Sequence, residues 1–552
     1  MLSAAAATTW VTLLAQARDL LMPEIILTAF GCLALVLAVT LPRENQRFVA
    51  YATLAGAVLS AVSLVSLFIV HGCELPIIGF SRMFVVDGFA LVLKGLFLAA
   101  LCVSTALSIK YLDIEGEQRG EYYALMAFAT VGMMCLAGGN DLLSLYISLE
   151  LMALSVYVLV GFTRRSRESN EASMKYFLLG SFSSAILLYG MSLLYGLTGS
   201  TNLSDISNAL PALVLVPRSG APDVRYVLMV AVCLLAAGLF FKIAAAPFHM
   251  WAPDAYEGAP TPVAAFMSVG VKAASFALFA RLFLDGIPGL RSLSDGGPGG
   301  LPGWGVLLAI AAAVSMTWGN IGALTQRNAK RLFAYSAVSH SGFLLLGLVA
   351  GNRTGYTGLV IYLAVYVAMN LGAFGVLITL HRRGIAGDRL EDFAGLAQRA
   401  PGLAAIMTLF LLSLGGIPPT AGFIGKFYMF YGLVETGDPW LIRLAILAVL
   451  NTVLSAYYYL QFVKGMFMGE PSEDAPAYAT SPSLWAATGL AALVTLFAGI
   501  YPQPVISISE RAIQGFSDSI VKPYSHGAGT EPPGGGPGKG GTDSERRARP
   551  RR

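Results

Sequence analysis

Charged residues are scarce in this sequence of 552 residues. Asp, Glu, Lys and Arg together make up 12% of it, whereas 56% of the residues are hydrophobic. The mean hydropathy is +0.68. Ordinary soluble domains carry about 25% charged residues, so this balance excludes a single soluble domain. The composition is typical of a protein that crosses a membrane many times.

Cysteine and histidine are also few, with five of each. Four cysteines lie in apolar runs and Cys73 lies in a loop, and their spacing matches neither a disulfide framework nor a metal site. No nucleophile triad and no dinucleotide fingerprint accompanies them. We therefore expect packed thiols, with no metal, no cofactor and no redox chemistry in this chain.

Apolar runs of about 20 residues are long enough to cross a bilayer as helices. Fourteen such spans are predicted, near residues 23–41, 49–70, 84–111, 122–138, 142–162, 173–198, 226–248, 262–284, 302–325, 330–350, 356–380, 402–434, 440–468 and 482–502. The seventh span contains Pro247, and the twelfth contains Gly415, Gly416, Pro418 and Pro419. Proline and glycine break helices, so spans 7 and 12 are predicted to be broken.

The two broken spans stand five apart, which suggests an internal repeat. Spans 4–8 and 9–13 are the candidate copies, and an odd number of spans makes them inverted in the membrane. We expect an all-α protein in the following segments: a three-helix segment (1–112), a first repeat (122–285), a second repeat (302–468), a C-terminal helix (482–505) and a disordered Gly/Pro/Arg-rich tail (523–552).

Basic residues cluster in the loops that join odd to even spans. They are Arg43, Arg47, Arg164, Arg165, Arg167, Arg327, Lys330, Arg331, Arg382, Arg383, Arg389 and Arg399. Loops rich in Lys and Arg stay on the cytoplasmic side. Both termini are therefore predicted to lie outside.

A few ionisable residues lie deep inside the apolar spans, where a charge costs several kcal/mol and is a functional candidate by default. The main ones are Glu150, Lys242, Lys272 and Lys426. Lys272 lies about ten residues, or roughly 15 Å, into its span, near the middle of the bilayer. For Lys242 the alternative is a lysine that extends from a helix end to water, and for Glu150 it is a structural ion pair.

Lys175, His249 and His340 are secondary candidates. Lys175 lies near the start of its span, so extension to water is as reasonable as function. A single buried histidine such as His340 is often a satisfied core residue, and the depth of His249 depends on how the break folds. Asp87 and Lys94 share a helix face and are expected to form a structural pair or to contact a neighbouring subunit.

Together, Glu150, Lys242, Lys272, His340 and Lys426 form a series of acids and bases, hereafter the titratable series. Moving one charge against 100 mV costs roughly 2.3 kcal/mol. Burial or an approaching opposite charge changes the protonation energy of such groups by a similar amount. The series is typical of a proton relay.

Four stretches resemble the antiporter-like membrane subunits of respiratory complex I, and among them the subunit N family of NADH-quinone oxidoreductase. They are FKIAAAPFHMWAPDAYEGAPTPVAAFMSVGVK, ISLELMALSVYVLVGF, RLFAYSAVSHSGFLLLG and GGIPPTAGFIGKF. The resemblance covers about residues 20–505. It implies fourteen transmembrane helices, two inverted five-helix repeats, and proton transfer through Glu150, Lys242, Lys272 and Lys426, with Lys175, His249 and His340 as secondary members.

The resemblance also implies a place in a bacterial inner-membrane complex, beside other antiporter-like and small membrane subunits. NADH, FMN, iron-sulfur clusters and a quinone would belong to the complex as a whole. A subunit of a multi-subunit cation/proton antiporter is one alternative, which the expected lack of a long amphipathic helix after span 14 disfavours. A stand-alone secondary transporter is another, but the sequence offers no cluster of polar groups for a substrate.

Overall fold

The chain forms helices wherever about twenty apolar residues run without interruption, because each helix satisfies its own backbone hydrogen bonds in lipid. We describe a computed structural model of the chain. It describes residues 16, 18, 20–72, 75–215, 224–291, 303–382, 387–471 and 481–520. The predicted tail (523–552), Cys73 and Arg383 lie outside the described residues.

Thirteen helices of the described chain are long and apolar enough to cross a membrane. The N-terminal segment contains α2 (Met22–Thr40), η1 (Arg43–Asn45), α3 (Arg47–His71), β1 (Ile77–Gly79), β2 (Phe84–Val86) and α4 (Gly88–Glu115). In the antiparallel β1–β2 hairpin, Ile77 pairs with Val86 and Gly79 with Phe84. The prediction that span 3 begins at residue 84 was therefore wrong. Asp87 caps α4 by accepting a hydrogen bond from the backbone of Ala90, which fixes the helix start at Gly88.

The next segment contains the first break. Its elements are α5 (Gly120–Gly138), α6 (Leu142–Val160), α7 (Arg167–Thr198), α8 (Leu203–Leu215), α9 (Val224–Lys242), α10 (Trp251–Gly258), α11 (Thr261–Phe266), η2 (Met267–Val271), α12 (Lys272–Ala280), η3 (Arg281–Gly286) and η4 (Pro288–Leu290). Residues 243–250 separate α9 from α10, and Pro247 lies among them. Helix α8 was not predicted. The elements from α11 to η3 form one continuous helix in which η2 and η3 are π-helical.

The following segment contains the second break. Its elements are α13 (Trp304–Leu324), α14 (Ala329–Ala350), α15 (Arg353–Leu380), η5 (Leu390–Phe393), α16 (Leu396–Arg399), α17 (Pro401–Gly415), α18 (Ala421–Glu435) and α19 (Pro439–Met468). Helices α17 and α18 occupy the predicted span 402–434 and are separated at residues 416–420, where Pro418 and Pro419 lie. With this pair, the all-α fold of about fourteen crossings is confirmed.

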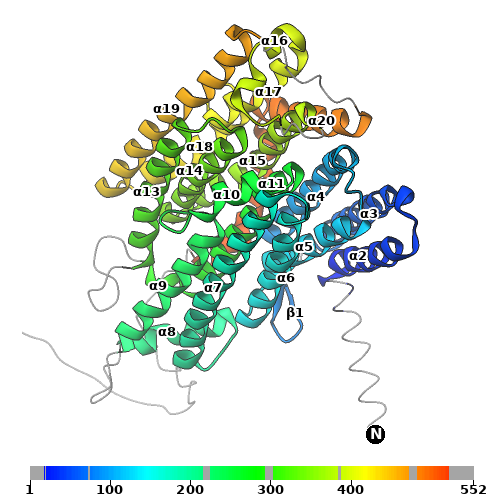
Figure 1. Cartoon of the computed structure of the whole chain (residues 1–552). Helices are drawn as coiled ribbons and strands as arrows, with labels where there is room; N and C mark the ends of the chain where they lie inside the picture. The colour runs from blue at the N-terminus through cyan, green and yellow to red at the C-terminus, as the bar shows by residue number, and fades with distance from the viewer. Residues whose placement is uncertain are drawn as a thin grey trace, which may run out of the picture.

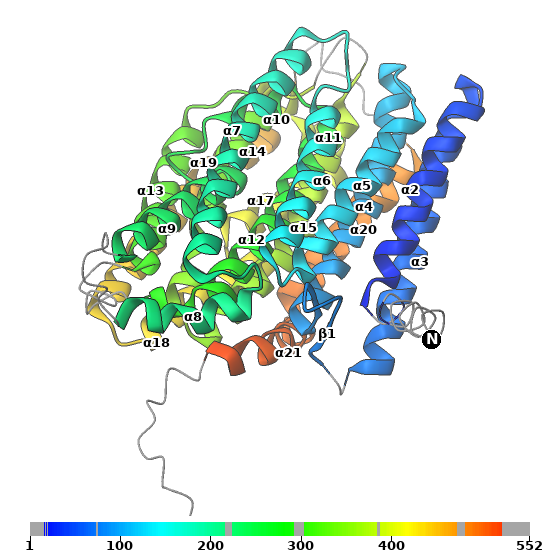
Figure 2. The same ribbon diagram turned by 90° about the horizontal axis from the view of Figure 1, so that it is seen from below.

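Two helices close the described chain, α20 (Pro482–Ile500) and α21 (Gln503–Ile520). Helix α21 was not predicted, and it adds an amphipathic helix of 18 residues after the last span. Figure 2 shows it lying across one end of the bundle, near β1. It packs against α4 and α15. The Gly88 backbone at the start of α4 approaches Arg511 and Ala512 of α21.

The interior of the bundle is formed by the helix α11–η3 together with α14 and α15, which are almost completely buried. Helix α14 packs against α10, α13, α15 and α18. Helices α2 and α3 lie at one edge and α19 at another (Figure 1). Both breaks therefore face a common central helix, α14.

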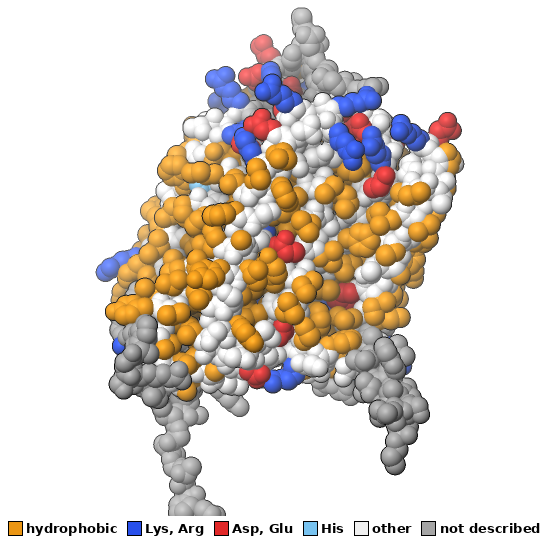
Figure 3. Space-filling model, turned by 60° about the horizontal axis from the view of Figure 1, so that its bottom comes forward, with side chains coloured by type: hydrophobic (Ala, Val, Ile, Leu, Met, Phe, Trp, Pro, Cys, Tyr) orange, Lys and Arg blue, Asp and Glu red, His pale blue; other side chains and the backbone are white. Residues whose placement is uncertain are grey.

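Basic side chains gather at one end of the molecule (Figure 3). Two adjacent cavities at this end share Glu115 and Thr163, and between them they are lined by Arg43, Arg47, Arg165, Lys330, Arg382 and Arg389. Members of all four predicted basic clusters thus meet at one end, hereafter the basic end. Elsewhere the visible surface is largely apolar, as expected where lipid surrounds a protein.

Candidate functional site

Helix α14 contributes three neighbouring residues to the centre of the titratable series: Ala337, His340 and Ser341. The Lys272 ammonium donates a hydrogen bond to the Ala337 carbonyl. The Ser341 hydroxyl lies 3.0 Å from that same carbonyl and 2.5 Å from the carbonyl of Ile243. Because Ile243 directly follows Lys242, one turn of α14 connects the first break with the lysine of the next helix.

Lys242 is the last residue of α9 and is 5% exposed. Its ammonium donates a 3.2 Å hydrogen bond to the hydroxyl of Tyr157. Tyr157 stands on α6 two turns after Glu150, whose carboxylate acts electrostatically on Lys242. Tyr157 therefore connects Lys242 with the helix that carries the acid of the series.

Glu150 is half-buried. Its Oε1 atom is buried and has no hydrogen-bond partner among the described residues. Leaving a buried carboxylate oxygen unpaired is costly, which favours a proton or a passing donor at this position.

Backbone geometry shapes the first break around Lys242. Ala244 has a φ of 55°, a left-handed conformation that costs a residue with a side chain about 1 kcal/mol or more. The Ala246 amide donates a 2.9 Å hydrogen bond to Ser315, and the Trp251 indole donates one of 2.9 Å to Phe241. These contacts hold in place the non-helical segment that follows Lys242.

The charges of Lys272 and Lys426 both act on the ring of His340. His340 has two partners. The Tyr362 hydroxyl lies 2.7 Å from its Nδ1 atom, and the Tyr459 hydroxyl lies 3.3 Å from Nε2. Both ring nitrogens thus contact groups that can donate or accept a proton.

Lys426 occupies the second break. Its ammonium donates hydrogen bonds of 3.0 and 3.3 Å to the carbonyls of Leu414 and Gly415, at the C-terminal end of α17. The negative end of a helix dipole favours a cation at this place. The ammonium also lies 4.6 Å from the ring centroid of Phe343, which belongs to α14. Gly416 follows with a φ of +75°, and a Cβ atom there would come 2.9 Å from the Lys426 side chain.

The secondary candidate Lys175 lies away from this series. It forms ion pairs of 2.7 Å with Glu171 and 2.8 Å with Asp254, and its side chain is 46% exposed. Arg331 pairs with the same Asp254 at 3.0 Å. Burial raises the pKa of Asp254, but the hydrogen bonds from Lys175 and Arg331 outweigh it and hold that pKa below its usual value.

His249 is buried beside the first break, where its ring meets the edge of Trp318 at 6.3 Å between centroids. Within the described chain, neither His249 nor Lys175 hydrogen-bonds to Glu150 or to the three buried lysines. Asp87 and Lys94 do not pair with each other. Arg281 binds Asp87 at 2.8 Å, and Lys94 binds Glu24 at 2.7 Å.

Sequence reasoning missed the hydroxyl groups that connect the series. They are Tyr157, Ser341, Tyr362 and Tyr459. The described residues contain no group of three or more His, Cys, Asp or Glu side chains arranged to hold a metal ion. What the site offers is a set of ammonium, imidazole, carboxyl and hydroxyl groups, most of them buried. Such groups can pass protons from one to the next.

Known proteins share this architecture. The family described as NADH:quinone oxidoreductase/Mrp antiporter, TM matches residues 139–455. NADH-quinone oxidoreductase subunit N 2 of Solibacter usitatus is 44% identical over 497 residues, covering 89% of this chain and 97% of the relative. Subunit N 1 of Koribacter versatilis is 47% identical over 498 residues, covering 89% and 94%.

Solved structures of related membrane complexes contain chains with the same fold. A chain of respiratory complex I from Thermus thermophilus with bound aureothin superposes with a TM-score of 0.71 at 33% identity, covering 88% of this chain and 99% of that one. A chain of the Mrp complex from Dietzia sp. DQ12-45-1b shares the fold, with a TM-score of 0.75 at 22% identity over 91% of this chain and 98% of that one. The extent and level of identity show that this chain belongs to the subunit N family of NADH-quinone oxidoreductase.

Proposed function

We propose that this chain is a proton-translocating membrane subunit of NADH-quinone oxidoreductase. Electron transfer from NADH to a quinone would take place in other subunits, which would hold the NADH, FMN, iron-sulfur clusters and quinone. The chain would contribute the membrane step, beside neighbouring antiporter-like and small membrane subunits. The relatives named subunit N and the complex I structure support this assignment.

Within the chain, protons would move through Glu150, Lys242, Lys272 and Lys426. The observation that carries this proposal is the meeting of the series at α14, where Lys272, Ser341 and the backbone after Lys242 share hydrogen bonds. His340 would join Lys272 to Lys426. Lys175 and His249 would have secondary roles, Lys175 through its ion pair with Asp254.

The mechanism rests on how a buried lysine responds to its surroundings. An ammonium drawn toward Glu150 is stabilised by the opposite charge, whereas one drawn away into a dry interior is favoured as the neutral amine. A change of this kind has to supply roughly 2.3 kcal/mol for each charge moved against 100 mV. The chain has two broken helices with a lysine at each break. Such a change in lysine protonation could therefore occur in each half of the chain, and we take the two halves as inverted repeats.

The basic end would face the cytoplasm, by the distribution of Lys and Arg. Helix α4 runs from Gly88, which packs against α21, to Glu115 at the basic end. The C-terminal helix α21 would then lie outside, as would both termini.

The test is Glu150→Gln and Lys242→Ala in the assembled complex. Proton uptake driven by NADH is measured in inside-out membrane vesicles, and assembly is measured on native gels. We expect pumping to fall at least tenfold with assembly intact, and Glu435→Gln, an exposed carboxylate, to leave pumping unchanged. Normal pumping in both test variants would overturn the proposal.

A further inference from the structure

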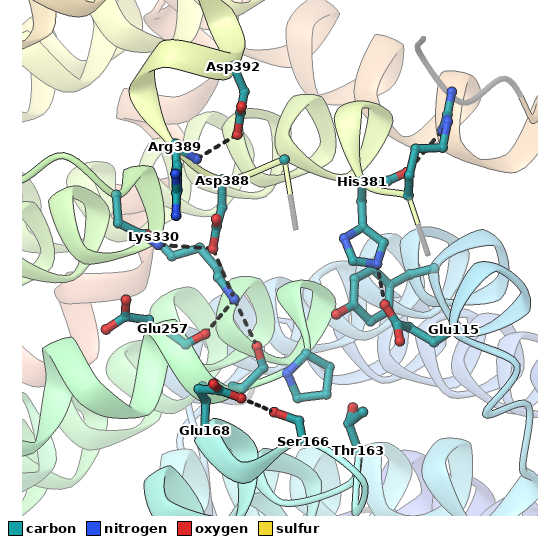
Figure 4. A pocket seen from close by; sticks show the side chains of 17 residues that line it. Glu115, Thr163, Ser166, Glu168, Glu257, Lys330, His381, Asp388, Arg389 and Asp392 are labelled. Carbon is teal, nitrogen blue, oxygen red and sulfur yellow. Dashed lines mark hydrogen bonds and ion pairs between the residues drawn. The ribbon is translucent and has the colours of Figure 1, made fainter. Parts of the chain in front are cut away.

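A cavity of about 740 Å³ opens at the basic end, directly above the central helices. Its walls come from elements far apart in the sequence (Figure 4). Glu115 ends α4, Thr163 and Ser166 lie between α6 and α7, Pro260 precedes α11, and Lys330 belongs to α14. The cavity therefore lies between the two predicted repeats, over the start of the helix that carries Lys272.

Acidic side chains outnumber basic ones around this cavity. The five carboxylates are Glu115, Glu168, Glu257, Asp388 and Asp392, and the three cations are Lys330, Arg382 and Arg389. The charge of one of these cations is already paired. The Lys330 ammonium donates a hydrogen bond to the backbone carbonyl of Glu257 at 2.5 Å and lies 3.7 Å from the Asp388 carboxylate. A cleft with an excess of one charge concentrates ions of opposite charge. This cleft would concentrate protons.

Glu115 and His381 form a close pair inside the cavity. The Glu115 Oε1 atom lies 2.5 Å from His381 Nε2, and their side chains are 22% and 7% exposed. The imidazole stacks on the ring of Tyr111, with 4.5 Å between centroids. Glu115 also lines the adjacent cavity with Glu117, Arg119 and Arg165, so it is reached from two sides. A carboxylate in contact with an imidazole offers both a proton acceptor and a proton donor at the wall of this cleft.

Hydroxyl groups occur at intervals along the helix that runs from this cavity to Lys272. The Tyr111 hydroxyl lies within hydrogen-bonding reach of Thr261, the first residue of α11. Ser268 lies seven residues further along the same continuous helix, and its hydroxyl accepts a 2.6 Å hydrogen bond from Asn370. Lys272 follows one turn later. The path from Thr261 to Lys272 spans eleven residues, or roughly 16 Å at 1.5 Å per residue.

We propose that Glu115 and His381 form the proton-collecting site of this subunit at its basic end, and that they deliver protons through Tyr111 and Thr261 toward Lys272. This inference rests on the proposed function. It adds the entry point, which none of the residues of the titratable series supplies, because they all lie deep in the membrane.

The rate at which protons reach a single site by diffusion explains why a proton-collecting site is useful. The diffusion limit of about 10¹⁰ M⁻¹ s⁻¹ gives one small site roughly 100 protons per second at pH 8, where the proton concentration is 10⁻⁸ M. Typical turnover numbers of about 1–10³ s⁻¹ reach this supply rate. A negatively charged cleft raises capture about 10- to 1,000-fold. Loss of the collecting pair would therefore slow uptake mainly at high pH.

The experiment uses Glu115→Gln, His381→Gln and the control Glu435→Gln in the whole complex. Glu435 is an exposed carboxylate that lines neither cavity of the basic end. NADH-driven proton uptake is measured in inside-out vesicles, whose outer face is the cytoplasmic one, from pH 6 to 9. We expect the first two variants to match the parent near pH 6 and to fall about three- to tenfold by pH 9. Added imidazole buffer should restore their uptake, and Glu435→Gln should follow the parent.

An unchanged pH profile, or a loss of equal size at every pH, would overturn the collecting site. Lys272→Ala, run beside them, separates this inference from the proposed function. If Lys272→Ala abolishes pumping while Glu115→Gln has no effect at any pH, only the entry site fails. If Lys272→Ala pumps normally, the proposed function itself fails.

Discussion

Lys242 donates a hydrogen bond to the hydroxyl of Tyr157, and the two atoms are 3.2 Å apart. Because Glu150 lies seven residues before Tyr157 on the same helix, this hydroxyl connects the base at the first break with the helix that carries the acid. Movement of the Lys242 side chain would change this connection without moving a helix.

Tyr157→Phe should therefore reduce proton pumping by about tenfold while the fold stays intact. A hydrogen bond to a charged group contributes about 1.5–3 kcal/mol, whereas the ring and its packing against Tyr176 are retained. Tyr189→Phe, on the exposed side of α7, is the matched control and should pump normally. Full pumping by Tyr157→Phe would remove the hydroxyl from the path.

Lys272→Arg should abolish pumping, because a guanidinium does not release its proton near neutral pH. The control is Lys94→Arg, a lysine that is equally buried but held in an ion pair with Glu24 at 2.7 Å. Arginine keeps that pair, so pumping per assembled complex should stay within about twofold of the parent. Coupled pumping by Lys272→Arg would instead make Lys272 a structural residue.

Gly416→Ala should damage the second break in two ways. Alanine is strained at a φ of +75°, and its Cβ atom would come 2.9 Å from the Lys426 side chain. The control Gly437→Ala has the same backbone strain, with a φ of +71°, but no atom within 4 Å of the new Cβ. Both variants should lose about 1 kcal/mol of stability, and only Gly416→Ala should also lose pumping. Equal pumping by the two would show that the close approach to Lys426 is unimportant.

The ion pairs around Asp254 should stabilise the basic end in a pH-dependent way. The pKa of Asp254 is lowered in the folded protein, so its contribution is complete above the unfolded pKa of about 4 and is lost as the pH falls through the folded pKa. Asp254→Asn should lower the thermal unfolding temperature at pH 7 by the equivalent of about 1 kcal/mol or less, as for other exposed pairs. The difference from the parent should shrink as the pH approaches 3. A difference that stays constant with pH would mean that packing, rather than charge, is responsible.

Much of the fold could be predicted because lipid demands about twenty apolar residues per crossing, and Pro247, Pro418 and Pro419 mark the two breaks. Shorter and amphipathic elements escaped prediction. The hairpin at Ile77–Gly79 and Phe84–Val86 is three residues per strand, and α21 has too many polar residues to read as a span. Local hydropathy does not detect elements whose apolar residues cover only one side.

Some residues of the site could be predicted from the sequence and others could not. The buried lysines were identifiable because a charge at depth needs an explanation, whereas tyrosines such as Tyr362 and Tyr459 are common in apolar helices. Their importance depends on facing His340, and sequence periodicity does not say which helices are neighbours. Lys175 shows the converse. A lysine near a helix start is compatible with either depth or surface, and in the structure it is largely at the surface.

The helix that carries Lys272 contains a π-helical turn directly before that residue, at Met267–Val271. A π turn holds one extra residue, and it can travel along a helix by exchanging backbone partners one at a time. If the turn passed Lys272, that side chain would swing by about 100° around the helix axis, since an α-helix has 3.6 residues per turn. Movement of the π turn would therefore rotate the Lys272 side chain, so that its ammonium could contact two different neighbours while both ends of the helix stay in place.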